Sequence, residues 1–290
     1  MNASDLAALR LLARAGGALC TLTGIEGSFS RAIGAHLAVA WDGRMAGSLA
    51  DGCLEAELAL QARALRGQGA RRLRYGRGSP VIDFRLPCGS GLDVLIDPAP
   101  DRPAIRAALR ALAARRPAVL ALPDPVLPQR LCLPPLRLEA FGAGPELTAL
   151  GRVAAASGIA CRLHPQPGLP AGLPPPDPWT AVLLLHHDHD REAPLLDWAL
   201  ASPAFFIGAI GGARIRQRRA ARLAQRHPPA QLARLRSPVG LAPASRDPAT
   251  LALSVLSHVV RDYQALADAR ARAAGAEHAL PGRADPSESR

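Results

Sequence analysis

The sequence contains no lysine, so all 35 of the basic residues in its 290 positions are arginine. A chain without lysine forms neither a Schiff base nor the lysine–phosphate contact of a P-loop. Arginine instead offers a planar fork of donors that suits phosphate and carboxylate. The formal net charge is +11, and we interpret it as a contribution to solubility rather than as a nucleic-acid surface.

Aromatic residues are also scarce, with five Phe, three Trp and two Tyr. Surfaces that bind single-stranded nucleic acid stack the bases on aromatic rings, so we expect no nucleic-acid partner. Hydrophobic residues nevertheless make up 49% of the chain, which is typical of a globular protein with aliphatic cores. The length is sufficient for two domains of ordinary size.

No apolar run approaches the roughly 18 residues that a membrane-spanning helix needs. The first 17 residues carry an early acid, Asp5, and predict an amphipathic helix rather than a signal peptide. The five cysteines are odd in number, widely spaced and without a C-x-x-C pair, which argues against a disulfide framework or a structural zinc site. We therefore expect a cytoplasmic protein without a membrane partner.

Residues 1–122 predict a small mixed domain of short strands and helices. The dipeptide Asp42-Gly43 is typical of a hairpin turn. From the apolar spacing we expect helices over 1–16, 53–66 and 102–115, and strands over 18–24, 35–40, 44–50, 71–75, 81–86, 92–96 and 118–122.

A proline-rich stretch over 123–135 predicts a linker. Strands and helices then alternate over 136–270, which predicts a Rossmann-like parallel sheet as the second domain of an α/β protein. Residues 271–290 are small and polar and predict a disordered tail. The expected strands are 136–141, 159–163, 181–185 and 205–207, and the expected helices are 145–157, 193–201, 214–225 and 248–267.

The clearest site signal is the segment 181–190, which reads AVLLLHHDHD. An apolar strand ends there in a cluster that includes His187, Asp188 and His189, at the end of the strand where parallel sheets place their ligand crevices. Two histidines on one face of a continued strand suit a metal, and a His–Asp pair suits acid–base chemistry near neutral pH. A solvated loop explains the same residues without any ligand.

A second strand leads into Gly142 and Gly144, the spacing of a turn that lets a phosphate approach the backbone. The third glycine of the dinucleotide motif is replaced by Leu147. The next strand ends in His164 and offers no acid for a ribose. These glycines are therefore interpreted either as a phosphate cradle or as part of a Rossmann scaffold that has lost its nucleotide.

Two cysteines stand out from the rest. Cys53 falls at a loop-to-helix junction, where free N–H groups favour a thiolate, and Cys88 lies in a glycine-rich loop between two strands. The remaining three lie in apolar runs and are interpreted as small core residues: Cys20, Cys132 and Cys161.

Five arginines fall within the ten residues 213–222, beginning with Arg214. Such a helix can bind a phosphate or an acidic surface, but a solvated helix face is the more frequent explanation of such a run.

Taken in serial order, these motifs resemble the XdhC/CoxI family of xanthine dehydrogenase accessory proteins. The resemblance covers most of the chain. It rests on Glu26-Gly27-Ser28, Arg31, Gly34, Gly52-Cys53-Leu54-Glu55, Pro87-Cys88-Gly89, Phe141-Gly142-Ala143-Gly144, His187-Asp188-His189, Ser202 to Gly211 and Pro238 to Leu241.

The resemblance implies a cytoplasmic carrier, not an enzyme, that binds molybdenum cofactor and protects it during sulfuration. The carrier then delivers the cofactor to xanthine dehydrogenase or a related molybdenum hydroxylase. A cysteine desulfurase would supply the sulfur, and the resemblance also suggests a homodimer.

The resemblance also implies which residues hold the cofactor. Gly142 and Gly144 would cradle its phosphate, Arg31 or Arg214 would pair with that phosphate, and a thiolate would meet the metal or a transferable sulfur. The thiolate would come from Cys53 or Cys88, and the cluster of His187, Asp188 and His189 would complete the set.

The chain departs from the family pattern at Asp51, at 242–245 and at 212–213, and all three changes fall near the expected crevice. Two alternatives from other classes remain open. One is an NAD(P)-dependent oxidoreductase that uses the crevice near Gly144, and the other is a metal-dependent hydrolase centred on His187, Asp188 and His189.

Overall fold

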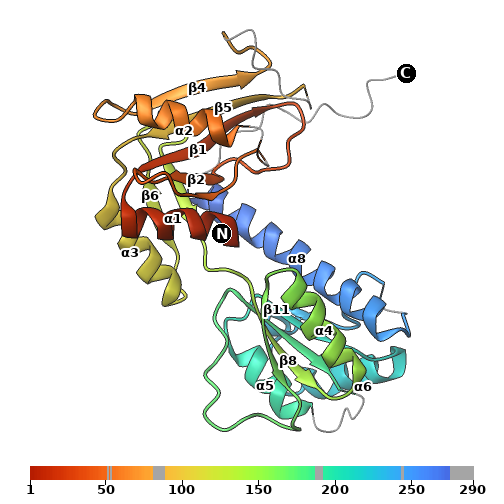
Figure 1. The fold of residues 1–290 in the computed structure, drawn as a ribbon. Coiled ribbons are helices and arrows are strands. Elements are labelled where there is room, and N and C mark those ends of the chain that lie inside the picture. The colour runs from red at the N-terminus through yellow and green to blue at the C-terminus, as the bar shows by residue number, and fades with distance from the viewer. Residues whose placement is uncertain (51, 53, 81–88, 187–191, 243–244, 275–290) are drawn as a thin grey trace. The chain divides into compact units, whose positions relative to one another are not determined.

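The computed structural model describes residues 1–50, 52, 54–80, 89–186, 192–242 and 245–274. Two compact units divide the chain: one comprises Met1–Pro134 together with the residues from Arg270 onward, and the other comprises Pro135–Ala269. Figure 1 labels the elements of both units. Each unit is described by itself.

The first unit is built on an antiparallel sheet with the strand order β3-β2-β1-β5-β4. The five strands are β1 (Ala18–Glu26), β2 (His36–Val39), β3 (Met45–Gly47), β4 (Arg71–Gly76) and β5 (Gly91–Asp97). Three helices and a two-stranded ribbon accompany them: α1 (Ala3–Ala15), α2 (Glu55–Ala64), α3 (Arg102–Ala113), β6 (Ala118–Ala121) and β7 (Gln129–Cys132).

Helices cover both faces of this sheet. Cys20 and Leu22 of β1 pack in one cluster with the apolar side of α2, whereas Leu19 packs in another with α1 and α3. Successive strand residues point to opposite faces, so one strand serves two cores. The predicted mixed domain is therefore confirmed as a three-layer unit.

The N-terminal helix shows how local sequence fixes the fold. The side chain of Asn2 caps α1 by accepting the N–H of Asp5 at 2.7 Å. Gly16 ends the helix with a φ of +69°, a conformation that glycine adopts without strain. The buried Asp5 carboxylate accepts the backbone N–H of His36 at 3.0 Å, which joins α1 to β2.

The predicted linker over 123–135 was wrong in part, because residues 129–132 form β7 and pair with β6. The prolines occupy the turn rather than the strands. At that turn the side chain of Asp124 accepts the N–H groups of Val126 and Leu127, both at 2.8 Å. A side-chain turn of this kind reverses the chain. The strand predicted over 81–86 lies outside the described residues.

The second unit is built on a parallel sheet with the strand order β12-β11-β10-β8-β9. Numbered from the first strand of this unit, that order is 2-1-3-4-5, one of the two common doubly wound topologies. Its strands are β8 (Arg137–Gly142), β9 (Ala160–His164), β10 (Thr180–Leu185), β11 (Phe206–Ala209) and β12 (Leu235–Arg236). The predicted Rossmann-like sheet is confirmed.

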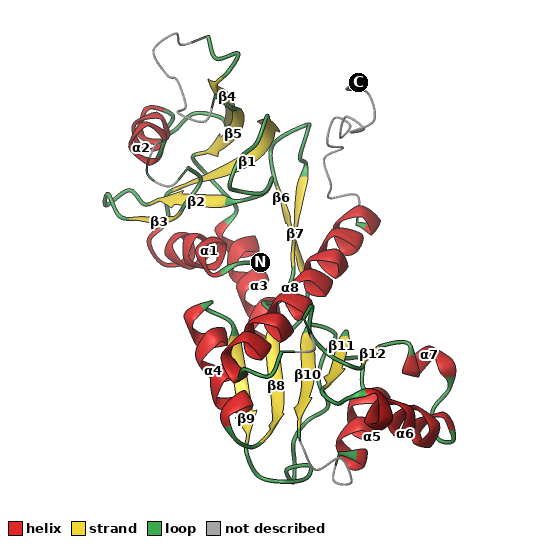
Figure 2. Cartoon of the chain, turned by 90° about the vertical axis from the view of Figure 1, so that its right-hand side faces the viewer, coloured by secondary structure: helices red, strands yellow, loops and turns green. Residues whose placement is uncertain are grey.

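Helices flank this sheet on both faces (Figure 2). Leu183 of β10 packs with α4 and α8, and its neighbours Val182 and Leu184 pack with α5 and α6. The helices are α4 (Pro145–Ala156), α5 (Ala193–Ala201), α6 (Ala213–Ala224), α7 (Pro229–Leu232) and α8 (Pro248–Ala273). The short α7 and β12 have no counterpart among the predicted elements.

The disordered tail predicted from residue 271 was wrong at its start, because α8 continues to Ala273. Residues 275–290 lie outside the described residues. Within the described part of the chain, no helix combines the length and apolar character required to cross a membrane.

We predict that His36 makes stability depend on pH. Its imidazole is fully buried, and burial, aided by nearby Arg130, lowers the pKa of His36 from 6.5 to about 3. Below pH 6.5 the imidazole of His36 is protonated in the unfolded chain but stays neutral in the folded chain until the pH approaches 3. Stability from the neutral ring is therefore complete above pH 6.5 and is lost as the pH falls towards 3.

Between pH 7.5 and 5.5, wild-type protein is expected to lose about 1 kcal/mol more unfolding free energy than His36→Gln. Denaturant unfolding curves at the two pH values measure this difference. Parallel losses in the two proteins would contradict it.

Candidate functional site

Three loops of the first unit leave the sheet at the same end. Glu26 at the end of β1 pairs with Gly91 at the start of β5, and Gly91 also pairs with Gly76 at the end of β4. β3 ends at Gly47, opposite Leu37 near the start of β2. β1, β3 and β4 therefore all end at this edge of the sheet, immediately before the segments 27–35, 48–54 and 77–90. These segments carry the three N-terminal motifs on which the family resemblance rests.

Loop 48–54 is organised by the first residue of α2, Glu55. Its carboxylate accepts five hydrogen bonds of 2.8–3.2 Å, from Ser48 Oγ and from the N–H groups of Leu49, Ala50, Gly52 and Leu54. Hydrogen bonds to a charged acceptor are about twice as strong as neutral ones. One side chain therefore binds every described residue of the turn that leads into α2.

The protonation state of Glu55 follows from these contacts. Partial burial acts to raise the pKa of Glu55, but hydrogen bonds from the N–H groups of Ala50, Glu55 and Leu49 and from the Ser48 hydroxyl outweigh it. The net pKa is lowered, so the carboxylate is charged at neutral pH. The stability that it confers is lost only as the pH falls through that lowered value.

Arg31 belongs to the same assembly. It is half-buried, and its Nη2 donates to Ser48 Oγ at 3.4 Å. Because Ser48 in turn donates to Glu55, the predicted phosphate partner is positioned against the loop that precedes α2. The structure therefore brings together two of the motifs that the sequence suggested.

The loop after β1 is fastened to the strands that flank loop 77–90. The guanidinium of Arg74 on β4 binds the carboxylate of Glu26, and its Nη1 lies 2.9 Å from Asp93 Oδ2. Ser90 Oγ donates to the carbonyl of Ser28 at 2.6 Å. These contacts fix the geometry of the Glu26-Gly27-Ser28 motif beside Gly89 and Ser90.

Cys53 and Cys88 themselves lie outside the described residues. The N–H groups of Gly52 and Leu54, which flank Cys53, both donate to Glu55. The expectation that free backbone donors at this junction stabilise a thiolate was therefore wrong for these two donors. The Arg31 guanidinium, which borders the same loop, is the cation that the structure places there.

The other three cysteines behave as thiols. Burial raises the pKa of Cys20 to about 12, that of Cys132 to about 11 and that of Cys161 to about 11. Cys20 and Cys132 are buried in apolar clusters, as their interpretation as core residues predicts, and Cys161 is half-buried.

In the second unit, β8 and β10 run side by side and end together, with Gly142 opposite Leu185. A Cβ at Gly142 would lie 2.7 Å from the Leu185 carbonyl oxygen, so glycine is required by the neighbouring strand. Gly144 caps α4 with a φ of +92°, which favours glycine there. His187, Asp188 and His189 follow β10 but lie outside the described residues.

The end of β9 is engaged in internal contacts. The imidazole of His164 stacks on Phe141 with ring centroids 4.3 Å apart, and its Nε2 lies 2.7 Å from the buried Glu139 carboxylate. Dinucleotide-binding folds place their ribose-binding acid at this position. The geometry here therefore gives no support to the NAD(P) alternative.

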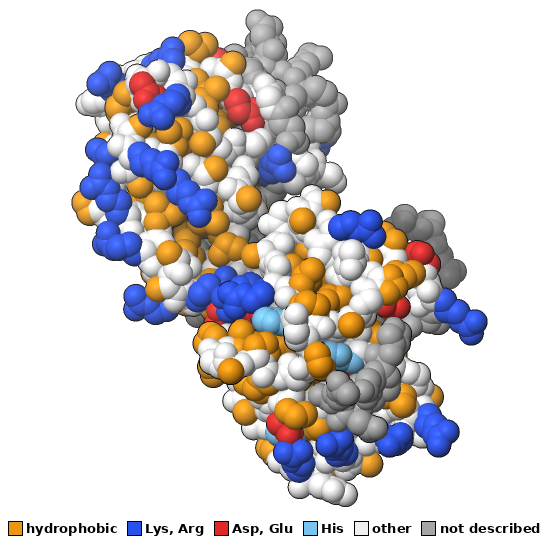
Figure 3. Space-filling view, turned by 60° about the horizontal axis from the view of Figure 1, so that its bottom comes forward, with side chains coloured by type: hydrophobic (Ala, Val, Ile, Leu, Met, Phe, Trp, Pro, Cys, Tyr) orange, Lys and Arg blue, Asp and Glu red, His pale blue; other side chains and the backbone are white. Residues whose placement is uncertain are grey.

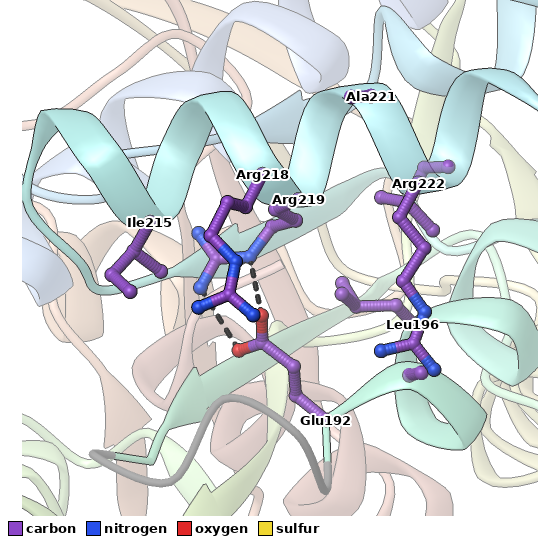
Figure 4. Close-up of a pocket in the computed structure, with 9 residues that line it drawn as sticks. Glu192, Leu196, Ile215, Arg218, Arg219, Ala221 and Arg222 are labelled. Carbon is purple, nitrogen blue, oxygen red and sulfur yellow. Dashed lines mark hydrogen bonds and ion pairs between the residues drawn. The ribbon is translucent and has the colours of Figure 1, made fainter.

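A pocket of about 350 Å³ lies between α5 and α6 (Figure 4). Glu192 and Arg219 form a buried bidentate ion pair on the wall of this pocket, with N–O distances of 2.7 and 2.9 Å. Arg214, the predicted phosphate partner, is exposed in the first turn of α6 and does not line this pocket.

The described surface shows neither one concentrated patch of arginine on the face drawn in Figure 3 nor a cluster of metal-ligating side chains. The space-filling view shows arginine side chains at many separate places on one face (Figure 3). Among the described residues, no group of three or more His, Cys, Asp or Glu side chains has the arrangement of a metal site. His187, Asp188 and His189, on which the hydrolase alternative rests, lie outside the described residues.

Two family models match the chain. The XdhC Rossmann domain matches residues 138–259, and the XdhC and CoxI family matches residues 11–76. The chain is also 34% identical over 270 residues to the molybdenum cofactor insertion chaperone PaoD of Escherichia coli strain K12. That match covers 86% of this chain and 84% of PaoD.

A solved Bacillus halodurans structure, described as a xanthine dehydrogenase, matches with a TM-score of 0.69 and 22% identity. The match covers 90% of this chain and 96% of that chain. At this level of identity the likeness concerns the fold alone.

Sequence reasoning missed the role of Glu55 and the Glu192–Arg219 pair. A glutamate in a first helical turn is expected from the helix dipole alone, so the five loop contacts gave no separate signal. Arg219 lies in a run of arginines, where only the three-dimensional structure distinguishes the buried member from the exposed ones.

We expect Glu55→Ala to loosen loop 48–54, because four backbone N–H groups and one hydroxyl lose their acceptor. Hydrogen exchange of the Leu49, Ala50, Gly52 and Leu54 amides should become at least about tenfold faster, since a hydrogen bond to a charged group is worth about 1.5–3 kcal/mol. Exchange mass spectrometry or NMR measures the change.

Glu57→Ala is the matched control, because the Glu57 carboxylate lies on the same helix and accepts from Gln61 at 2.8 Å rather than from the loop. If loop exchange were the same in both variants, the organising role of Glu55 would be refuted.

Proposed function

The chain belongs to the XdhC and CoxI family, and from this premise we propose that it is a carrier that binds molybdenum cofactor and delivers it to a molybdenum enzyme. The observation that carries the proposal is the 34% identity with a molybdenum cofactor insertion chaperone across 86% of the chain. Because that identity spans both units, it concerns the whole molecule and not one shared domain.

We further propose that the protein protects the cofactor during sulfuration. A cysteine desulfurase would supply the sulfur, and a xanthine dehydrogenase-type hydroxylase would receive the loaded cofactor. In this role the protein is a carrier without a catalytic residue of its own. The homodimer and the cytoplasmic location remain predictions.

In the first unit, considered by itself, Cys53 and Cys88 are the proposed contacts to molybdenum or to a transferable sulfur. Thiolates are soft ligands suited to such a metal and to sulfur exchange. The described residues nearest to the two cysteines are held in place: Gly52, next to Cys53, donates to Glu55, and Ser90, two residues after Cys88, donates to the Ser28 carbonyl. Arg31 adds a cation beside one of these loops.

In the second unit, considered by itself, the proposed cofactor contacts lie at the carboxyl ends of β8 and β10. Gly142 lets the β8 backbone approach Leu185, and Gly144 caps α4, so the N-terminus of α4 lies directly after this turn. A helix N-terminus favours a negatively charged group. His187, Asp188, His189 and Arg214 complete the proposed set of cofactor contacts.

Co-expression with an active molybdopterin pathway tests the function. The purified protein is oxidised, and the fluorescent pterin released is quantified against protein. We expect near-stoichiometric pterin. Its absence, with a known chaperone loaded in parallel, would exclude the carrier role.

Cys53→Ala and Cys88→Ala are expected to retain about tenfold less pterin, which corresponds to about 1.4 kcal/mol of lost binding. Cys161→Ala is the control, because it removes a thiol from a strand of the second unit and should leave retention unchanged. Full retention by both single variants and by the double variant would rule out the thiolate role.

A further inference from the structure

The pocket between α5 and α6 lies near the carboxyl ends of two parallel strands. Glu192 directly precedes α5 in the connection from β10, and Gly212 caps α6 after β11. Doubly wound sheets bind their ligands outside the carboxyl ends of the strands. The volume of about 350 Å³ falls in the range of small-molecule sites, roughly 300–1,000 Å³.

The buried ion pair on the pocket wall serves the fold rather than a ligand. Besides its two bonds to Glu192, Arg219 donates to Ser237 Oγ at 2.6 Å and to the Ile210 carbonyl at 2.8 Å. The two charges neutralise each other, so the pair adds no net charge to the pocket. It does fix the distance between α5 and α6.

The net charge of the pocket comes from two other arginines. Arg218 and Arg222 are both exposed, line the pocket and lie one helical turn apart on α6. Neither has a carboxylate partner among the described residues, whereas Arg226, just beyond the end of α6, binds Asp197 at 2.5 Å. Like charges one turn apart on a helix repel each other, and a bound anion would relieve that repulsion.

The remaining lining is apolar. Leu196 and Ala193 contribute from α5, and Ile215 and Leu223 contribute from α6. A cavity lined by two guanidinium forks of α6 and by aliphatic side chains of both helices is complementary to a ligand with an anionic end and an apolar or planar body.

We infer that this pocket binds an organic phosphate, with the phosphate between Arg218 and Arg222 and the body against Leu196 and Ile215. The site shares no residue with the proposed cofactor contacts at Gly142, Gly144 and Arg214. The inference rests on the pocket alone and does not require the carrier function. Two ligands have the required phosphate group: a bound pterin cofactor and a free nucleotide.

Calorimetric titration of the cofactor-free, full-length protein with AMP and with adenosine tests the inference. AMP is expected to bind at least about tenfold more tightly than adenosine, because only AMP engages the two guanidinium groups. The double variant Arg218→Gln/Arg222→Gln should lose this preference.

Arg216→Gln is the matched control, since Arg216 is exposed on the same helix and does not line the pocket. Unchanged unfolding midpoints in both variants would establish that the fold is intact. If AMP failed to bind, or bound the double variant and wild type equally, the inference would be overturned.

Pterin retention by the double variant distinguishes the two sources. Retention that falls together with AMP binding identifies the cofactor phosphate as the occupant, and unchanged retention identifies a separate nucleotide. Since the AMP titration uses protein without cofactor, it gives its answer even if the wild type carries no pterin.

Discussion

The first unit depends on one carboxylate. Glu55 accepts five hydrogen bonds from the loop between β3 and α2, and without it four backbone N–H groups would need other partners. The neighbouring loops are held differently: Arg74 ties Glu26 to Asp93, and Ser90 ties the chain to Ser28. The ends of three loops are therefore set by charge-assisted contacts, while the strands below them are set by apolar packing.

The second unit depends instead on strand register. Because β8 and β10 pair in parallel and stop together, the turn after β8 and the segment after β10 begin at the same edge of the sheet. Gly142 is needed to let the two backbones approach, whatever ligand lies beyond them. A glycine at this position is therefore explained by the fold, and a phosphate cradle has to be argued from the helix behind it.

Sequence periodicity anticipated the helices and strands of both units because apolar spacing reports directly on packing. It failed where local side-chain chemistry decides the path. Asp124 closes a turn inside a proline-rich stretch, so that β7 forms where a linker was expected. It also failed for roles that depend on contacts remote in sequence, such as the pairing of Arg219 with Glu192 across 27 positions. Arg219 is of the same type as its neighbour Arg218, so the sequence does not single it out.

Arginine, the only basic residue besides histidine in this sequence, donates to backbone carbonyl groups at the ends of helices. Arg234 donates to the carbonyls of Leu200, in the last turn of α5, and of Ser202 and Ala204, just after it. Arg102 and Arg106 both donate to the Ala13 carbonyl near the end of α1. A planar fork with five donors can satisfy several orphan carbonyls at once, which a single ammonium group cannot do with the same geometry. These three arginines therefore hold helix ends in place. Arg218 and Arg222 differ from them, because the two guanidinium groups line one cavity and have no carboxylate partner among the described residues.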